Sequence, residues 1–253
     1  SFIGQEIYTE CWVPTTADVK GLIYVCHGLA EYVWEGYRAF AELHASNGFV
    51  VFGNDHFRHG RSSGQPRAYF DDFDELVNTT LHYIRSVRAE YPADIPAFVM
   101  GHSLGGHIAL HSILRDEGSF RGAILIGPSV RFPSDIRNFF TELLGKVLDR
   151  VAPQLCITNI TPEQVTTEPI WQNAIKDDPL VDKDCIRVRV FHVMFGASDF
   201  VQERLNRVHL PVLIQNGVLD KLNAPDNGEF IKKNLGSKDV KLQIFDDAGH
   251  HLL

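Results

Sequence analysis

The sequence has no long hydrophobic run and no excess of basic residues. No stretch approaches the ~18 uninterrupted apolar residues of a membrane-spanning helix, and no signal-peptide pattern is seen. The net charge of -8 excludes a general nucleic-acid-binding protein, which would carry a basic surface. We therefore expect neither a membrane span nor a nucleic acid partner.

Cysteine is also scarce. The chain has 4 cysteines, widely spaced and without a CxxC pair, and no histidine pair has convincing metal spacing. We expect no metal and no cofactor. We favour free thiols in a cytoplasmic protein, although two disulfides stay open as the alternative. The thiols belong to Cys11, Cys26, Cys156 and Cys185.

What the sequence does contain is the pattern of one large α/β domain. A hydrophobic content of 44% in 253 residues excludes a disordered chain. Apolar runs alternate with segments of helical period, which predicts a mostly parallel sheet flanked by helices. Strands are expected near residues 6–13, 21–26, 49–53, 97–100, 122–126, 211–215 and 241–245. Helices are expected near residues 37–47, 72–90, 104–115 and 226–234.

One stretch interrupts this alternation. Between the strands ending at Ile126 and starting at Pro211, the signals are mostly helical, with no clear strand pair. We therefore expect a core of residues 1–128 and 207–253, with a helical cap of residues 129–206 inserted into it.

An apolar stripe in this cap follows helical spacing from Ile136 to Val151. Packing on the domain below is favoured over membrane contact, because the opposite face is mixed in charge rather than basic. Contact with a membrane surface stays open as the alternative.

A glycine-flanked serine stands between a strand-like and a helix-like run. The heptapeptide GHSLGGH, residues 101–107, follows an apolar segment ending at Met100. The pattern G-x-S-x-G at a strand-to-helix turn is the nucleophile elbow of α/β-hydrolases, in which the serine hydroxyl stands above the sheet. We therefore predict the α/β-hydrolase fold, with Ser103 as the nucleophile.

A serine nucleophile needs a base, and the base needs an acid that holds its ring. In this fold the three occur in the order Ser, Asp or Glu, His. Asp220 follows the expected strand 211–215, and His250 follows the expected strand 241–245. We predict Asp220 as the acid and His250 as the base.

Rival residues lie close to these two. Asp226 has the pattern of a helix start, and Asp246 and Asp247 are too near His250 to come from a separate strand end. His251 is the alternative base, and His250 is preferred because it directly follows the Ala-Gly turn.

Attack on an ester carbonyl builds negative charge on its oxygen, which two backbone N–H groups must stabilise. One donor is predicted to be Leu104, the residue after the nucleophile. The other is predicted to be Leu29 in the HGLAE loop, because Gly28 lets the backbone pass close to the site.

Together these motifs resemble the monoacylglycerol lipases. The motifs are HGLAE at 27–31, NDHFRHGRS at 54–62, GHSLGGH at 101–107, Asp220 and His250, with IGPSV at 126–130 and DPL at 178–180. The resemblance implies hydrolysis of a monoacylglycerol to a fatty acid and glycerol, with the acyl chain in a tunnel under the cap. It also implies a lipid ester as the partner, a substrate-binding role for Glu31, and loose association with membranes.

Three positions depart from the family pattern. Arg58 stands where the family's second loop usually has glycine, Gly36 replaces an arginine, and Leu253 replaces a second histidine. In the family, the arginine and the histidine help to hold the glycerol end. The acyl-ester chemistry is therefore better supported than the preference for glycerol.

Two other functions stay open. The same triad could act on another ester, such as a lysophospholipid or a short-chain carboxylester. Alternatively, the scaffold could serve as a ligand-binding protein without catalysis, because a fold does not fix a function.

Overall fold

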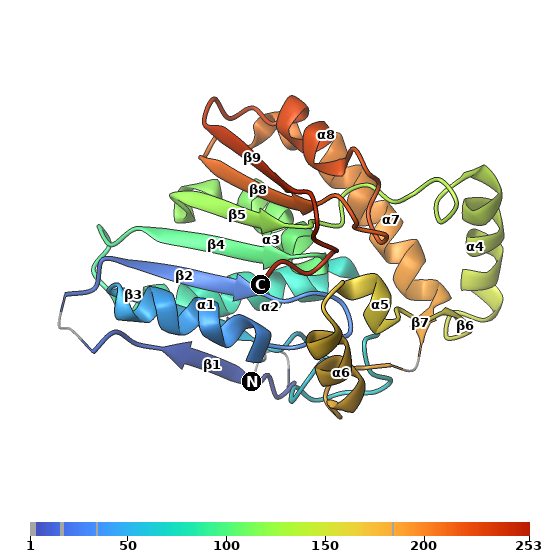
Figure 1. Cartoon of the computed structure of the whole chain (residues 1–253), viewed down its shortest axis with the longest axis horizontal. Coiled ribbons are helices and arrows are strands. Elements are labelled where there is room, and N and C mark those ends of the chain that lie inside the picture. Colours follow the sequence, from blue (N-terminus) through green and yellow to red (C-terminus); the bar gives the residue numbers. More distant parts are fainter. Residues whose placement is uncertain (1–3, 16–17, 34, 184) are drawn as a thin grey trace.

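The computed structural model describes residues 4–15, 18–33, 35–183 and 185–253, and in them seven strands form one sheet (Figure 1). The strand order is β1-β3-β2-β4-β5-β8-β9, and each neighbouring pair is parallel except β1 with β3. The strands are β1 (Thr9–Trp12), β2 (Gly21–Cys26), β3 (Phe49–Asn54), β4 (Ala97–His102), β5 (Gly122–Ile126), β8 (Val212–Gly217) and β9 (Val240–Phe245). The predicted mostly parallel sheet is confirmed.

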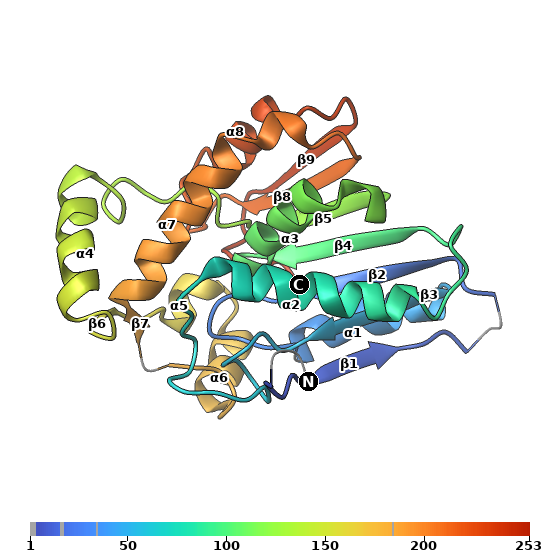
Figure 2. The same ribbon diagram turned by 180° about the vertical axis from the view of Figure 1, so that it is seen from behind.

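Helices cover both faces of the sheet. Figure 1 shows α1 (Glu35–Ser46) in front of it, and Figure 2, seen from behind, shows α2 (Phe73–Arg88) and α3 (Leu104–Arg115) on the other face. The helix α8 (Asn227–Asn234) packs against β8 and β9. All of β2 is buried, as is typical of a parallel sheet covered on both sides. None of the described helices is long and apolar enough to cross a bilayer.

The segment between β5 and β8 contains helices and a second, small sheet. Its α-helices and strands are α4 (Phe139–Val151), β6 (Cys156–Thr158), α5 (Pro162–Val165), α6 (Pro169–Asp177), β7 (Ile186–Arg187) and α7 (Val188–Gln202), and a short 3-10 helix (Leu205–Arg207) follows them. Because β6 and β7 pair antiparallel, the expectation of no strand pair here is wrong. Strands of 3 and 2 residues are too short to show an alternating pattern in the sequence.

The helix α7 fixes this segment to the core, whereas α4 does not. Val190 and Val201 of α7 are buried in the same hydrophobic cluster as side chains of α2 and α3. In contrast, α4 packs against α7 at the outer edge of the molecule (Figures 1 and 2). Leu144, Val147 and Val151 are more than half exposed, at 59%, 54% and 74%. For these three residues the favoured packing on the domain below is wrong, because α4 stands away from that domain.

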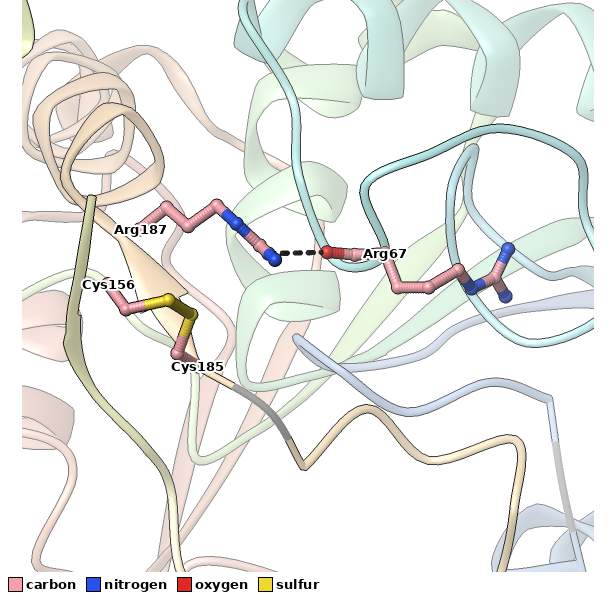
Figure 3. Close-up of a disulfide and its surroundings, with 4 residues drawn as sticks. All are labelled: Arg67, Cys156, Cys185 and Arg187. Carbon is pink, nitrogen blue, oxygen red and sulfur yellow. Dashed lines mark hydrogen bonds between the residues drawn. A yellow bond between two sulfur atoms is a disulfide. The ribbon is translucent and has the colours of Figure 1, made fainter. Parts of the chain in front are cut away.

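A disulfide joins the two strands of the small sheet, as Figure 3 shows. Cys156 of β6 is bonded to Cys185, which directly precedes β7. The expectation of free thiols is wrong for this pair and holds for Cys11 and Cys26. The sequence hid the pair because the short hairpin that brings the two cysteines together was itself not predictable. Disulfides are typical of oxidising compartments. The expected free thiols therefore no longer support a cytoplasmic location.

The hairpin is also tied to the core. Nη1 of Arg187 in β7 donates a hydrogen bond of 3.0 Å to the carbonyl oxygen of Arg67 (Figure 3). Arg67 lies in the loop between β3 and α2. The disulfide therefore closes residues 156–185 into a loop, next to the contact that Arg187 makes with the core.

We expect the double variant Cys156→Ser, Cys185→Ser to unfold at a lower temperature than the wild type. The bond spans 29 residues, and closing a loop of that length stabilises the folded state by about 3–4 kcal/mol in the chain-entropy account. Thermal unfolding without reductant measures the difference, with Cys11→Ser as the control. If the Tm of the double variant equalled that of the control, the disulfide would have no stabilising role.

Candidate active site

Ser103 lies at the sharp turn between β4 and α3. Its backbone φ of 53° is in the left-handed region, which residues other than glycine rarely adopt. A side chain on Gly105 would collide with the carbonyl group of Cys26, so the turn requires glycine there. The flanking glycines thus let helix and strand approach closely, while Ser103 carries the strained backbone.

Asp220 and His250 form a buried pair. They follow β8 and β9, and Nδ1 of His250 lies 2.8 Å from Oδ2 of Asp220. Oδ1 of Asp220 accepts hydrogen bonds from the N–H groups of Leu222 (2.8 Å) and Asn223 (3.2 Å). Burial raises the pKa of Asp220, but the charge of His250 and these hydrogen bonds outweigh burial, so that the pKa lies below its usual value. The ionised Asp220 holds a proton on Nδ1 and leaves Nε2 of His250 as an acceptor.

Ser103 and His250 line one cavity of about 270 Å³. Nε2 of His250 is buried and has no hydrogen-bond partner in the described part of the chain. The Ser103 hydroxyl lies 3.1 Å from the hydroxyl of Ser129. Ser103 and His250 therefore line the same cavity. In the part of the chain that the structure describes, no hydrogen bond joins them. Such bonds are often long until a substrate binds.

The roof of this cavity comes from the segment that the disulfide closes. Side chains in and around α5 and α6 provide most of the lining. The apolar ones are Ile160, Pro162, Val165, Ile175 and Val181. On the core side, Leu29 and Leu222 continue the apolar surface. An acyl chain is the kind of group that such a lining favours.

Leu29 lines the cavity, and Leu104 is the first residue of α3. Neither backbone N–H has an acceptor among the residues that the structure describes, and the first N–H groups of a helix lack partners within it. Nδ1 of His27 donates to the carbonyl oxygen of Gly28 (2.8 Å). Because the C=O and N–H of a trans peptide point in opposite directions, this bond turns the Leu29 N–H away from His27. The role of the two amides as oxyanion donors stays a prediction.

Glu31 lines the cavity and also fixes the loop that carries Leu29. Its Oε1 accepts hydrogen bonds from the Gly28 N–H (2.6 Å), the Tyr37 hydroxyl (2.9 Å) and Nδ1 of His102 (2.7 Å). Burial raises the pKa of Glu31, but the charge and hydrogen bond of His102 outweigh it and lower the pKa to about 2. Glu31 is therefore an anion with one oxygen committed to the loop, and its contact with substrate stays a prediction.

The alternative base, His251, lies in this same cluster. One ligand atom each from Glu31, His102 and His251 lie within 4.8 Å of one another. Since Oε1 of Glu31 is already hydrogen-bonded, we interpret the group as a polar cluster rather than a metal site. Burial lowers the pKa of His251 to about 3. His250 carries the hydrogen bond to Asp220.

The rival acids lie elsewhere. Asp226 forms an ion pair with Arg131 at the start of α8. Asp246 and Asp247 are exposed in the turn after β9. Only Asp220, of the four aspartates considered, has a hydrogen bond to His250 in the described ranges.

Two residues of the site were not predicted from the sequence. Ser129 contacts the Ser103 hydroxyl, and Nδ2 of Asn223 donates to Oδ2 of Asp220 (3.0 Å) and to the carbonyl oxygen of Gly127 (2.8 Å). Ser129 did carry a signal, because it follows β5 at the sheet edge where the other strand ends place the three predicted catalytic residues. Asn223 carried none beyond its closeness to Asp220.

The structure also explains the departure at Arg58. Its φ of 62° is left-handed, a conformation for which the glycine of the family pattern is suited. The guanidinium lies 4.9 Å from the ring centroid of Phe57 and 5.2 Å from that of Tyr69. These cation–π contacts stabilise the arginine side chain at this position.

The fold, the turn at Ser103 and the Asp220–His250 pair define a serine hydrolase of the α/β-hydrolase class. The family described as serine aminopeptidase, S33 matches residues 17–253. Human monoglyceride lipase is 30% identical, with 98% of this chain and 81% of the relative covered. The monoacylglycerol lipase of Mycolicibacterium smegmatis is 26% identical, with 98% and 87% covered.

A solved structure agrees with these relatives. The crystal structure of Paleococcus ferrophilus monoacylglycerol lipase has a TM-score of 0.83 at 25% identity, and the match covers 97% of this chain and 90% of that one. The chain therefore belongs to the serine aminopeptidase S33 family and, within it, to the monoglyceride lipases. The resemblance noted in the sequence is confirmed.

Proposed function

We propose that the chain hydrolyses monoacylglycerols to a fatty acid and glycerol through an acyl-enzyme on Ser103. The observation that carries the proposal is the 2.8 Å pair of Asp220 and His250, with His250 on the cavity wall that also carries Ser103. The monoglyceride lipases of human and M. smegmatis, similar over nearly the whole chain, support the substrate class.

The reaction follows from these positions. Nε2 of His250 takes the proton of Ser103 while the serine oxygen attacks the ester carbonyl, and Asp220 stabilises the imidazolium. The N–H groups of Leu29 and Leu104 stabilise the oxyanion. His250 then gives the proton to the departing glycerol oxygen. Water cleaves the acyl-enzyme by the same route.

The glycerol end of the substrate needs other partners in this chain than in the family. Gly36 is a buried position at the start of α1, and Leu253 packs beside apolar residues. Neither supplies the arginine or histidine of the family pattern. We propose that Glu31, the anion on the cavity wall, accepts hydrogen bonds from the glycerol hydroxyls.

Product analysis tests this function. Monoacylglycerols of several chain lengths, a lysophospholipid and a short-chain ester are each incubated with the wild type, and released fatty acid and alcohol are quantified. We expect the highest kcat/KM for a monoacylglycerol. If another ester were cleaved faster, that ester and not monoacylglycerol would define the substrate class. No product together with no labelling by a fluorophosphonate would favour the ligand-binding alternative.

In this proposal residues 129–206 form the cap over a core of residues 1–128 and 207–253, and α4 contacts the lipid surface. Its exposed apolar residues are Leu143, Leu144, Val147 and Val151, and Leu155 and Ile157 follow them closely. An exposed apolar helix face is suited to the boundary of a lipid layer. Because the charges on α4 are mixed, we expect binding that depends little on salt.

We expect Leu144→Ser, Val147→Ser to lower the partition constant for phosphatidylcholine vesicles, measured by sedimentation, about a hundredfold or more, because burying two such side chains contributes about 3 kcal/mol or more. Lys146→Ser on the same helix is the control. Activity on a short-chain ester in water should stay at the wild-type level in both variants. Equal sedimentation of the apolar variant and the control would contradict contact through α4.

A further inference from the structure

The loop after β5 lies beside His250 and Ser103 and is linked to Asp220 through Asn223. The carbonyl oxygen of Gly127 accepts a hydrogen bond from Asn223, which also bonds Asp220. A side chain on Gly127 would lie only 3.1–3.4 Å from atoms of His250. Ser129 completes the loop by contacting the nucleophile. Residues 127–129 therefore bridge the acid–base pair and the serine.

Ser129 is held against the nucleophile by two contacts. Its backbone N–H donates to the carbonyl oxygen of Ser103 (3.1 Å), and its hydroxyl lies 3.1 Å from the Ser103 hydroxyl. Ser129 is 5% exposed and does not belong to the residues that line the cavity. Its hydroxyl thus contacts the reacting oxygen without forming part of the cavity lining.

The chemistry of the attack decides which of the two hydroxyls must donate. The single proton of Ser103 has to go to Nε2 of His250, which is buried and lacks another partner in the described residues. While that proton is shared with His250, the Ser103 oxygen can only accept from Ser129. Hydrogen bonds in such a chain strengthen one another, because each donor polarises the next.

We propose that Ser129 is a further catalytic residue, whose hydroxyl donates to the Ser103 oxygen during both halves of the reaction. The inference rests on the proposed function. In acylation the Ser129 proton stays on its own oxygen and stabilises the negative charge that grows on Ser103 as His250 takes the Ser103 proton. In deacylation the Ser103 oxygen is the leaving group, and Ser129 stabilises it until His250 returns the proton.

The test compares Ser129→Ala, Ser129→Thr and the control Ser112→Ala, a buried serine in α3. The first measurement is the second-order rate of labelling by a fluorophosphonate, which reports on Ser103 without lipid binding. We expect about tenfold slower labelling for Ser129→Ala, the factor that one lost hydrogen bond causes. Ser129→Thr, which keeps the hydroxyl, should label close to the wild-type rate, as should the control.

Steady-state kinetics on a monoacylglycerol gives the second measurement. We expect kcat of Ser129→Ala to fall by a factor similar to that in labelling, with KM unchanged, because Ser129 does not line the cavity. A structural role alone would instead lower the Tm and slow Ser129→Thr as much as Ser129→Ala, which would overturn the proposal.

Three other results would also overturn it. Unchanged labelling of Ser129→Ala would show that the contact has no part in the attack. Faster labelling would show that Ser129 withholds the Ser103 hydroxyl from His250. If the wild type took no label, the proposed function itself would fail, and the inference with it. Labelling of the wild type tests the proposed function, and the ratio of the Ser129→Ala rate to the wild-type rate tests the role of Ser129.

Discussion

Ser103→Ala lowers kcat for monoacylglycerol hydrolysis by about a million-fold, the size of effect that removal of a serine nucleophile has in other triads. The variant cannot form the acyl-enzyme. A water molecule that attacks the ester instead is not held in position as the serine hydroxyl is by the strained turn. KM should change little, since the apolar roof of the cavity stays intact. Release of fatty acid, measured at high enzyme concentration, detects the residual rate that the oxyanion donors still support.

The matched control is Ser112→Ala, which removes a buried hydroxyl from α3 without altering the turn. We expect this control to keep the wild-type kcat and to label with a fluorophosphonate, whereas Ser103→Ala does not label at all. A Ser103→Ala variant that still labels would move the nucleophile to another residue.

The sheet was predictable because its strands combine apolar runs with turn residues at their ends. The run Gly21–Cys26 has six consecutive buried residues, and such a run stands out in the sequence. The hairpin of β6 and β7 gave no comparable signal. Two short strands have no period of their own, and the disulfide that joins them depends on a pairing across 29 residues.

The same contrast holds within the site. Asp220 and His250 were predictable because parallel strands place their carboxyl ends at one edge, so two strand ends far apart in the sequence come together. The contact of the Ser129 hydroxyl with Ser103 depends on the path of the loop after β5. The hydrogen bonds of the Asn223 amide depend on a turn after Asp220. Neither path follows from residue types. Sequence order therefore led to the predicted triad, but it did not give the contacts that Ser129 and Asn223 make with it.

Asp220→Asn should lower kcat about ten-thousand-fold, the size of effect found for the corresponding change in another triad. The reason lies in the partners of the two carboxylate oxygens. Oδ1 accepts from the N–H groups of Leu222 and Asn223, and only the carbonyl oxygen of an asparagine can accept there. Its NH₂ group must then stand where Oδ2 stands, 2.8 Å from Nδ1 of His250.

That amide would donate to Nδ1 of His250, so the ring proton would move to Nε2 and the imidazole could no longer take the proton of Ser103. Nitrogen NMR of the labelled His250 ring distinguishes the two tautomers directly, beside the loss of kcat. Asp246→Asn, at an exposed position after β9, is the matched control and should keep wild-type activity. If Asp246→Asn were the more damaging change, the acid would come from the last strand end. If Asp220→Asn kept the proton on Nδ1, the loss of activity would arise from charge alone.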